Sequence, residues 1–114
     1  MDKLKEEKGK PTASILVVDD NPNKRLAVIS VLEGLQQNIV TVDSGREALR
    51  ALLDHEYAVL LLDVQMPIMD GFETAELIRS RALSENTPII FITAYTHAET
   101  DMLRGYSLGA VDFI

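Results

Sequence analysis

The segment SILVVDD, residues 14–20, is an apolar run that passes directly into two aspartates. Two later segments repeat this pattern, VLLLD at residues 59–63 and IIFIT at residues 89–93, and each ends on a polar side chain. Continuous apolar runs of this length are typical of strands that are buried on both faces of a parallel sheet. The three segments therefore predict an α/β protein built around a parallel sheet.

The polar residues that end these runs are Asp19, Asp20, Asp63 and Thr93. In parallel sheets ligands bind outside the carboxyl ends of the strands, so we expect these side chains to converge on one edge. Carboxylates that are crowded together repel one another, and they stay ionised only when a cation joins them. A hard divalent cation bound by oxygen atoms is the expected partner.

Helix signals separate the apolar runs. The pair Asn21-Pro22 fits an N-cap followed by a first helical residue, and capping boxes begin at Ser44, Asp70 and Thr96. These signals predict four helices. In the first helix we expect an apolar stripe to face the core, formed by Leu26, Ile29, Val31, Leu32 and Leu35.

Strands and helices alternate along this part of the chain, and Gly109 is placed to end the last helix just before a final apolar segment. Strict alternation predicts a doubly wound arrangement, in which a parallel sheet carries helices on both faces. Right-handed crossovers then leave few topologies. The expected strands cover residues 14–19, 38–42, 58–63, 88–93 and 110–114.

The composition limits the class of protein. The 114 residues suit one domain, and a hydrophobic content of 46% with 25% charged residues is ordinary for a globular protein. The absence of cysteine excludes a disulfide scaffold and a thiolate metal site. The net charge of -7 argues against direct nucleic-acid binding, and no apolar run is long enough for membrane insertion. We expect a cytoplasmic location, a linker or disordered tail over residues 1–13, and one domain over residues 14–114.

Four short motifs occur in order at the expected strand ends: DD at residues 19–20, DVQMPIMDG at 63–71, TA at 93–94 and GAVDF at 109–113. Together they resemble the receiver domain of two-component response regulators, which also occurs in hybrid histidine kinases. The acidic pair alone would be a weak signal, but all four motifs in order at strand ends are specific. The resemblance covers residues 14–114.

The resemblance implies a flavodoxin-like sheet of strand order 2-1-3-4-5 and a Mg²⁺-dependent phosphorelay reaction. Asp63 would take a phosphoryl group from a phosphohistidine of a histidine kinase or a histidine phosphotransfer domain. Asp20 and Asp63 would bind Mg²⁺ directly and Asp19 through a bound water, and the backbone carbonyl of Gln65 would be a further ligand. Thr93 would hydrogen-bond the phosphoryl group. The domain would catalyse only its own phosphorylation and dephosphorylation.

The resemblance also sets an expectation for the end of the chain. Phe113 matches an aromatic position whose side chain turns inward in phosphorylated members of the family, which alters the surface offered to an output domain or protein. The family has a lysine two residues past the position of Ile114, and a fifth helix follows. We therefore expect a receiver truncated before the fifth helix. Its uncovered sheet face is expected to lead to self-association, as a homodimer, or to marginal stability.

Two other functions fit parts of the pattern. A haloacid-dehalogenase-like phosphatase also uses an aspartate nucleophile and Mg²⁺ beside a parallel sheet. That family has a second aspartate two residues after its nucleophile, and here Asn21 occupies that place. A pseudo-receiver would bind partners without being phosphorylated. The intact set of Asp19, Asp20, Asp63 and Thr93 argues against it, while the family lysine, which this sequence does not contain, leaves it open.

Overall fold

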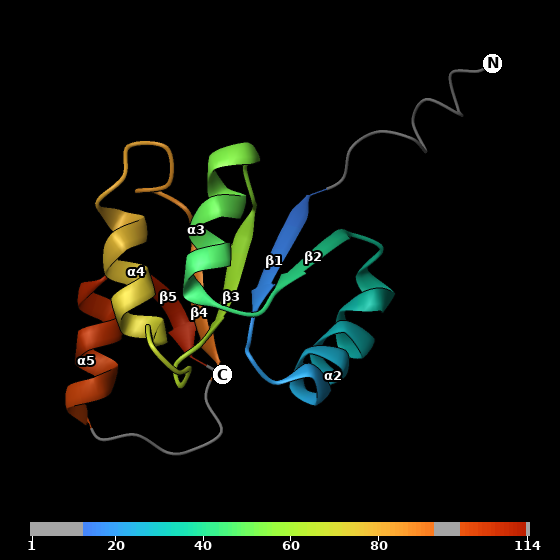
Figure 1. Cartoon of the computed structure of the whole chain (residues 1–114), viewed down its shortest axis with the longest axis horizontal. Helices are drawn as coiled ribbons and strands as arrows, with labels where there is room; N and C mark the ends of the chain where they lie inside the picture. The colour runs from blue at the N-terminus through green and yellow to red at the C-terminus, as the bar shows by residue number, and fades with distance from the viewer. Residues whose placement is uncertain (1–12, 93–98, 114) are drawn as a thin grey trace.

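Five parallel strands form one sheet at the centre of the molecule (Figure 1). The computed structural model describes residues 13–92 and 99–113, with side chains for residues 13–92 and 103–109. The strand order is β2-β1-β3-β4-β5, so the predicted doubly wound, flavodoxin-like arrangement is confirmed. The strands are β1 (Ser14–Val18), β2 (Asn38–Val42), β3 (Val59–Asp63), β4 (Ile89–Ile92) and β5 (Ala110–Phe113).

Helices connect successive strands, as the alternating pattern predicts. Asn21 accepts hydrogen bonds from two N–H groups of the first helix, and Ser44 accepts one from the second. Asp70 and Glu73 form a complete capping box on the third. The fourth predicted cap, Thr96, lies outside the described residues. The helices are α2 (Pro22–Leu32), the 3-10 turn η1 (Glu33–Leu35), α3 (Gly45–Asp54), α4 (Gly71–Arg79) and α5 (Glu99–Ser107).

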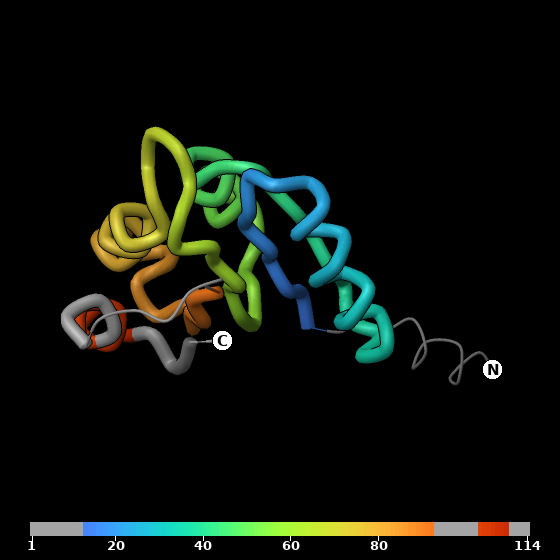
Figure 2. The backbone as a smooth tube through the Cα atoms, turned by 90° about the horizontal axis from the view of Figure 1, so that it is seen from below, coloured from blue at the N-terminus to red at the C-terminus, as the bar shows by residue number. Residues whose placement is uncertain are grey.

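Side chains of β1 alternate between two apolar cores. Ile15 and Val17 pack with Leu61 of β3 in a smaller core beneath α2. Leu16 and Val18 belong to the larger core, which contains apolar residues of α3 and α4. Figure 2 shows α2 set apart from α3 and α4, with β1 running between them. Both faces of this strand are therefore buried from Ile15 to Val18, which is why its sequence is apolar at these four positions.

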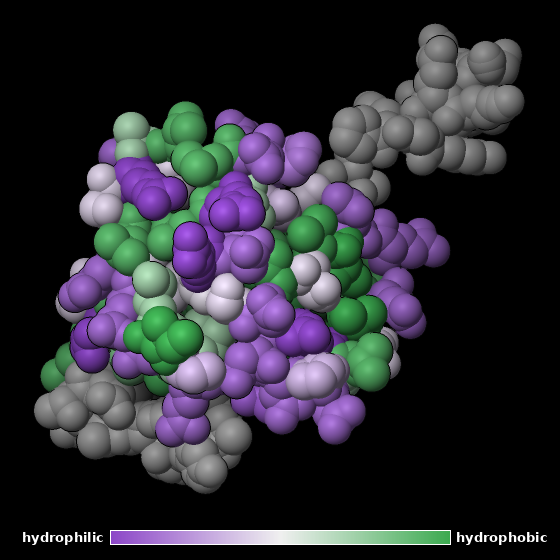
Figure 3. Space-filling view, in the orientation of Figure 1, coloured by the Kyte–Doolittle hydropathy of each residue, from purple (hydrophilic) through white to green (hydrophobic). Residues whose placement is uncertain are grey.

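The helix α2 covers its face of the sheet less completely than we predicted. Leu26 and Val31 of α2 are 62% and 78% exposed and Leu35 of η1 is 55% exposed, so the predicted stripe is wrong at these positions. Val28 and Leu32 pack against the smaller core instead. The apolar residues of α2 lie on all sides of the helix, so their pattern does not predict which face packs against the sheet. Figure 3 shows apolar surface gathered over β2 and α2.

Arg79, the last residue of α4, joins three segments of the chain. Its Nε donates a hydrogen bond to Leu108 O at 2.7 Å, and its two terminal nitrogens reach Thr87 O, Glu85 O and Gly109 O at 2.6, 3.1 and 3.1 Å. Gly109 follows α5 with a φ of 82°, as expected for a glycine that ends a helix. One guanidinium thus holds α4 to the loop before β4 and to the turn between α5 and β5.

Gly71 brings the start of α4 against the end of β3. Its N–H donates a hydrogen bond to Val64 O at 2.8 Å, and the residue is buried. A Cβ at this position would overlap the carbonyl oxygen of Asp63 and lie 2.8 Å from Val64 Cα. The close approach of the two backbones therefore requires glycine at position 71. This contact packs the start of α4 against the backbone of Asp63.

The substitution Gly71→Ala is expected to lower the free energy of unfolding by about 2 kcal/mol or more, because the added methyl group overpacks against rigid backbone. Urea denaturation followed by circular dichroism measures the change. Gly34→Ala is the matched control, because a Cβ there meets nothing within 4 Å. It should shift stability by no more than about 0.5 kcal/mol. Equal losses in the two variants would contradict the packing argument.

Candidate functional site

Three carboxylates meet at the carboxyl ends of β1 and β3. Asp19 and Asp20 follow β1 directly, and Asp63 is the last residue of β3. The two strands are paired in parallel with Val18 opposite Leu62, so their ends coincide. Each aspartate offers a carboxylate oxygen, and these oxygens lie within 4.8 Å of one another. We call these three residues the acidic edge, and their predicted convergence is confirmed.

The three carboxylates differ in their surroundings. Asp19 and Asp63 are 2% and 1% exposed, whereas Asp20 is open to solvent. Asp19 Oδ1 accepts a hydrogen bond from the N–H of Asn21 at 2.9 Å, and Asp63 Oδ1 accepts one from Gln65 N–H at 3.3 Å. Asp19 Oδ2 is buried and accepts no hydrogen bond. The edge therefore contains a buried anionic oxygen that lacks a full set of partners.

Among the residues that the structure describes, two basic side chains contact the acidic edge, and the sequence patterns did not single out either of them. Lys24 Nζ lies 3.4 Å from Asp63 Oδ2 and 3.5 Å from Asp19 Oδ2. Arg25 donates a hydrogen bond to Asp19 O at 2.6 Å. Both belong to the first turn of α2. Because this helix begins at Pro22, only two residues after Asp20, its first side chains lie close to the end of β1. The sequence signal that could have predicted these contacts is the position of Asn21-Pro22, the start of the helix, directly after the acidic pair.

Electrostatic interactions at the edge shift two pKa values. Burial raises the pKa of the Asp63 carboxyl above its ordinary value of 3.8, and the Asp19 carboxylate raises it further. The Lys24 ammonium and the Gln65 N–H partly offset these effects. Burial lowers the pKa of Lys24, but the carboxylates of Asp63 and Asp19 outweigh burial and raise it above 10.5. Asp63 therefore carries its negative charge at a cost to the folded state.

The residues of the acidic edge fit a hard divalent cation. Carboxylate oxygens are the ligands that Mg²⁺ prefers in proteins, and three of them converge here. The buried Asp19 Oδ2, which accepts no hydrogen bond, is a further feature that a cation would satisfy. The acidic edge thus has the donor atoms that such an ion requires, and its three carboxylates are only partly neutralised by the ammonium group of Lys24.

The structure describes only part of the remaining predicted site residues, which are Gln65, Thr93 and Phe113. Gln65 lies two residues beyond Asp63, and its N–H contacts that carboxylate. Thr93 lies outside the described residues, although Ile92 before it pairs with Asp63. The backbone of Phe113 ends β5, but its side chain lies outside the described part of the chain.

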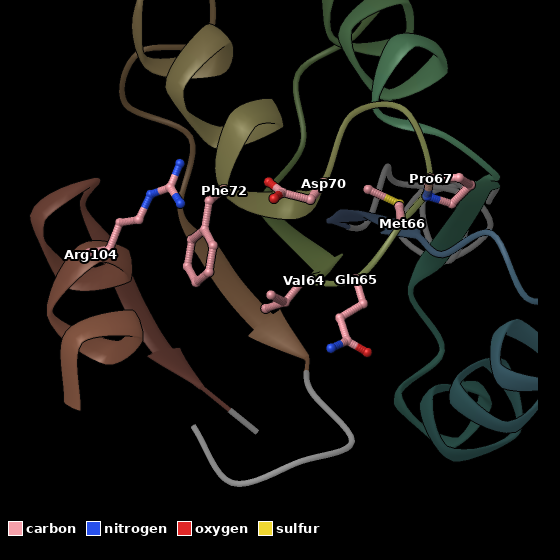
Figure 4. A pocket seen from close by; sticks show the side chains of 7 residues that line it. All are labelled: Val64, Gln65, Met66, Pro67, Asp70, Phe72 and Arg104. Atoms are coloured by element: carbon pink, nitrogen blue, oxygen red, sulfur yellow. The ribbon is translucent and has the colours of Figure 1, made fainter. Parts of the chain in front are cut away.

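A pocket lies between the segment that links β3 to α4 and the helix α5 (Figure 4), and it includes Gln65, whose N–H contacts Asp63. The guanidinium of Arg104 lies 4.8 Å from the centre of the Phe72 ring, as a cation–π contact. Ile68 of the same segment is fully exposed and has a φ of 71°, which is uncommon for a β-branched residue. The pocket is lined by Val64, Gln65, Met66, Pro67, Asp70, Phe72 and Arg104.

The family model for the response regulator receiver domain matches residues 15–114. The chain belongs to this receiver domain family. It is accordingly a receiver domain of two-component signalling, and its acidic edge is consistent with Mg²⁺-dependent phosphoacceptance. The resemblance inferred from the four sequence motifs is confirmed.

Relatives of this receiver domain belong to longer proteins. It is 38% identical over 103 residues to a probable cyclic di-GMP phosphodiesterase of Vibrio cholerae, a match that covers 89% of the chain and 22% of the relative. It is 33% identical over 92 residues to the signal transduction histidine-protein kinase BarA of Escherichia coli, a match that covers 81% of the chain and 10% of the kinase. The receiver domain therefore spans less than a quarter of either relative.

The receiver domain is also similar to solved structures. The response regulator protein TrrA of Thermotoga maritima, solved in complex with Mg(2+)-BeF, matches with a TM-score of 0.78 and 34% sequence identity. The match covers 90% of this chain and 84% of that one. Within the described residues of this receiver domain, no helix has the length and apolar character needed to cross a membrane.

The raised pKa of Asp63 has a consequence for the stability of the metal-free receiver domain. The folded state binds the Asp63 proton more tightly than the unfolded state does. Tighter proton binding stabilises the folded state. This contribution is complete below the pKa of 3.8 that Asp63 has in the unfolded state, and it is lost as pH rises through the higher pKa of the folded state. Asp63→Asn should therefore increase the free energy of unfolding at neutral pH and flatten its dependence on pH in this range.

Urea denaturation in EDTA, repeated between about pH 4 and pH 7, tests this expectation. Glu85→Gln, which alters an exposed carboxylate in the loop before β4, is the control and should leave the pH profile unchanged. A variant at Asp63 that is less stable than the unaltered chain at pH 7 would contradict the electrostatic interpretation.

Proposed function

We propose that Asp63 accepts a phosphoryl group from a phosphohistidine of a histidine kinase or a histidine phosphotransfer domain, in a reaction that requires Mg²⁺. The convergence of three carboxylates within 4.8 Å at the ends of β1 and β3 carries this proposal. Asp63 suits the acceptor role because it terminates a central strand, whereas Asp19 and Asp20 lie in the loop that follows β1. Membership of the receiver domain family supports the same assignment.

In the proposed reaction, an ionised carboxylate oxygen of Asp63 attacks the phosphorus atom. A P–O bond forms as the P–N bond to the histidine breaks, and the histidine nitrogen retains the electron pair of that bond. The N–H of Gln65 holds Asp63 Oδ1 and so orients the carboxylate. Such transfers depend mainly on positioning and on neutralisation of charge around phosphorus, which suits a site made of oxygen ligands and a nearby ammonium.

Mg²⁺, when bound, would neutralise charge on the phosphoryl oxygens. We assign Asp20 and Asp63 as its direct ligands, Asp19 as a ligand through water, and the Gln65 carbonyl as a further ligand. Thr93 is assigned a hydrogen bond to the phosphoryl group. The TrrA structure, which is similar over 90% of this chain and was solved with Mg(2+)-BeF, supports a magnesium site here.

The domain is proposed to act in the cytoplasm as one module of a phosphorelay and to catalyse only its own phosphorylation and dephosphorylation. Its relatives include a histidine kinase and a probable phosphodiesterase, so receiver domains of this kind are joined to different output units. The exposed apolar residues Leu26 and Val31 of α2 support the further proposal that two copies associate through this side.

Acetyl phosphate with Mg²⁺ is expected to phosphorylate Asp63, and intact-mass spectrometry should detect one added phosphoryl group per chain. Asp63→Asn removes the nucleophile, so it should abolish the labelling, and EDTA should abolish it in the unaltered protein. Glu85→Gln is the control and should label normally. Equal labelling of the Asp63 variant would contradict the assignment. Absence of labelling with retained partner binding would favour a pseudo-receiver, and repeated turnover of phosphate esters would favour a phosphatase.

Mg²⁺ is expected to stabilise the unphosphorylated domain, because an ion that binds only the folded state shifts the folding equilibrium toward that state. At a concentration about thirtyfold above Kd, the gain should be about 2 kcal/mol. Thermal melting with increasing Mg²⁺ measures the effect, and Asp20→Asn should reduce it. A melting temperature that is unchanged at millimolar Mg²⁺ would count against a preformed site.

A further inference from the structure

Lys24 occupies a defined position at the acidic edge. Its ammonium group lies between two carboxylates, 3.4 Å from Asp63 Oδ2 and 3.5 Å from Asp19 Oδ2. Its backbone is fixed by the cap of α2, since Asn21 Oδ1 accepts a hydrogen bond from Lys24 N–H at 3.1 Å. The lysine is thus held to the acidic edge by both its backbone and its side chain.

The contacts of Lys24 overlap with those a metal ion would make. Asp63 Oδ2 and Asp19 Oδ2 both face the ammonium, and the second of these oxygens accepts no hydrogen bond. Mg²⁺ binds oxygen at about 2.0–2.1 Å and keeps several water molecules around it. An ammonium so close to the same oxygens would repel the ion and exclude its water.

We propose that Lys24 is a resident counter-cation that Mg²⁺ must displace, and that it thereby weakens metal binding to the unphosphorylated domain. The inference rests on the proposed function, because it requires the acidic edge to bind Mg²⁺. The side chain of Lys24 is 40% exposed, so its flexible stem has an open path into solvent when the ion enters. When the ion enters, the ammonium group of Lys24, with one positive charge, is replaced by Mg²⁺ from solution, with two.

Isothermal titration of the metal-free protein with Mg²⁺ tests the proposal directly. Lys24→Met keeps an unbranched stem and removes the charge, so Mg²⁺ should bind about threefold to tenfold more tightly than to the unaltered chain. In EDTA the same variant should melt at a lower temperature, because Asp19 and Asp63 lose their shared partner. Saturating Mg²⁺ should remove most of that difference.

Two controls separate the role of Lys24 from a general effect of charge. Lys24→Arg keeps the positive charge beside the two carboxylates, so it should bind Mg²⁺ no more tightly than the unaltered chain does. Arg50→Met removes an exposed positive charge from α3 and should also leave the affinity within about twofold. Lys24→Gln, a polar neutral variant, replaces the methionine variant if circular dichroism shows that the latter is unfolded.

The outcomes distinguish this proposal from the proposed function. If the unaltered chain binds Mg²⁺, Asp20→Asn weakens binding and the neutral Lys24 variants bind no more tightly, the role of Lys24 is wrong and the magnesium site stands. If neither the unaltered chain nor the neutral variants bind Mg²⁺, both proposals fail. Tighter binding by the neutral Lys24 variants, with no gain in affinity in either control, supports both proposals.

Discussion

Repulsion between the carboxylates of Asp19 and Asp63 is the constraint around which this domain is organised. The parallel register of β1 and β3 brings the two strand ends together, and burial of both side chains removes most of the water that would otherwise screen them. The sheet therefore holds an electrostatically unfavourable group of charges in place. Such an arrangement favours whatever supplies positive charge, whether a cation from solution or a side chain of the protein itself.

Several local features hold this unfavourable group in place. The N–H groups of Asn21 and Gln65 each donate to one carboxylate, and Lys24 lies near both. Gly71 allows α4 to approach the backbone of Asp63 more closely than any other residue type would permit. These features come from three different segments, so the geometry of the edge depends on how α2, β3 and α4 meet rather than on the strand ends alone.

The sheet was predictable because β1, β3 and β4 contain continuous apolar runs, and the family motifs supplied the strand order. The carboxylates of Asp19 and Asp63 were predictable for the same reason, since parallel strands place their carboxyl ends together. The buried face of α2 was not, because Leu26 and Val31 are as apolar as the residues that contact the sheet. The contact of Lys24 depends on the path of one turn after β1, which composition and periodicity do not describe.

The helix α2 has no fully buried residue, whereas α3 and α4 each contribute several to the larger core. Local unfolding requires least free energy where few apolar contacts are lost, so the amides of α2 should exchange with solvent hydrogen sooner than those of the central strands. Because Lys24 and Arg25 belong to α2, a single local opening would carry both positive charges away from the carboxylates. Asp63 is thus held by a central strand of the sheet, whereas Lys24 and Arg25 are held by a helix that has no fully buried residue.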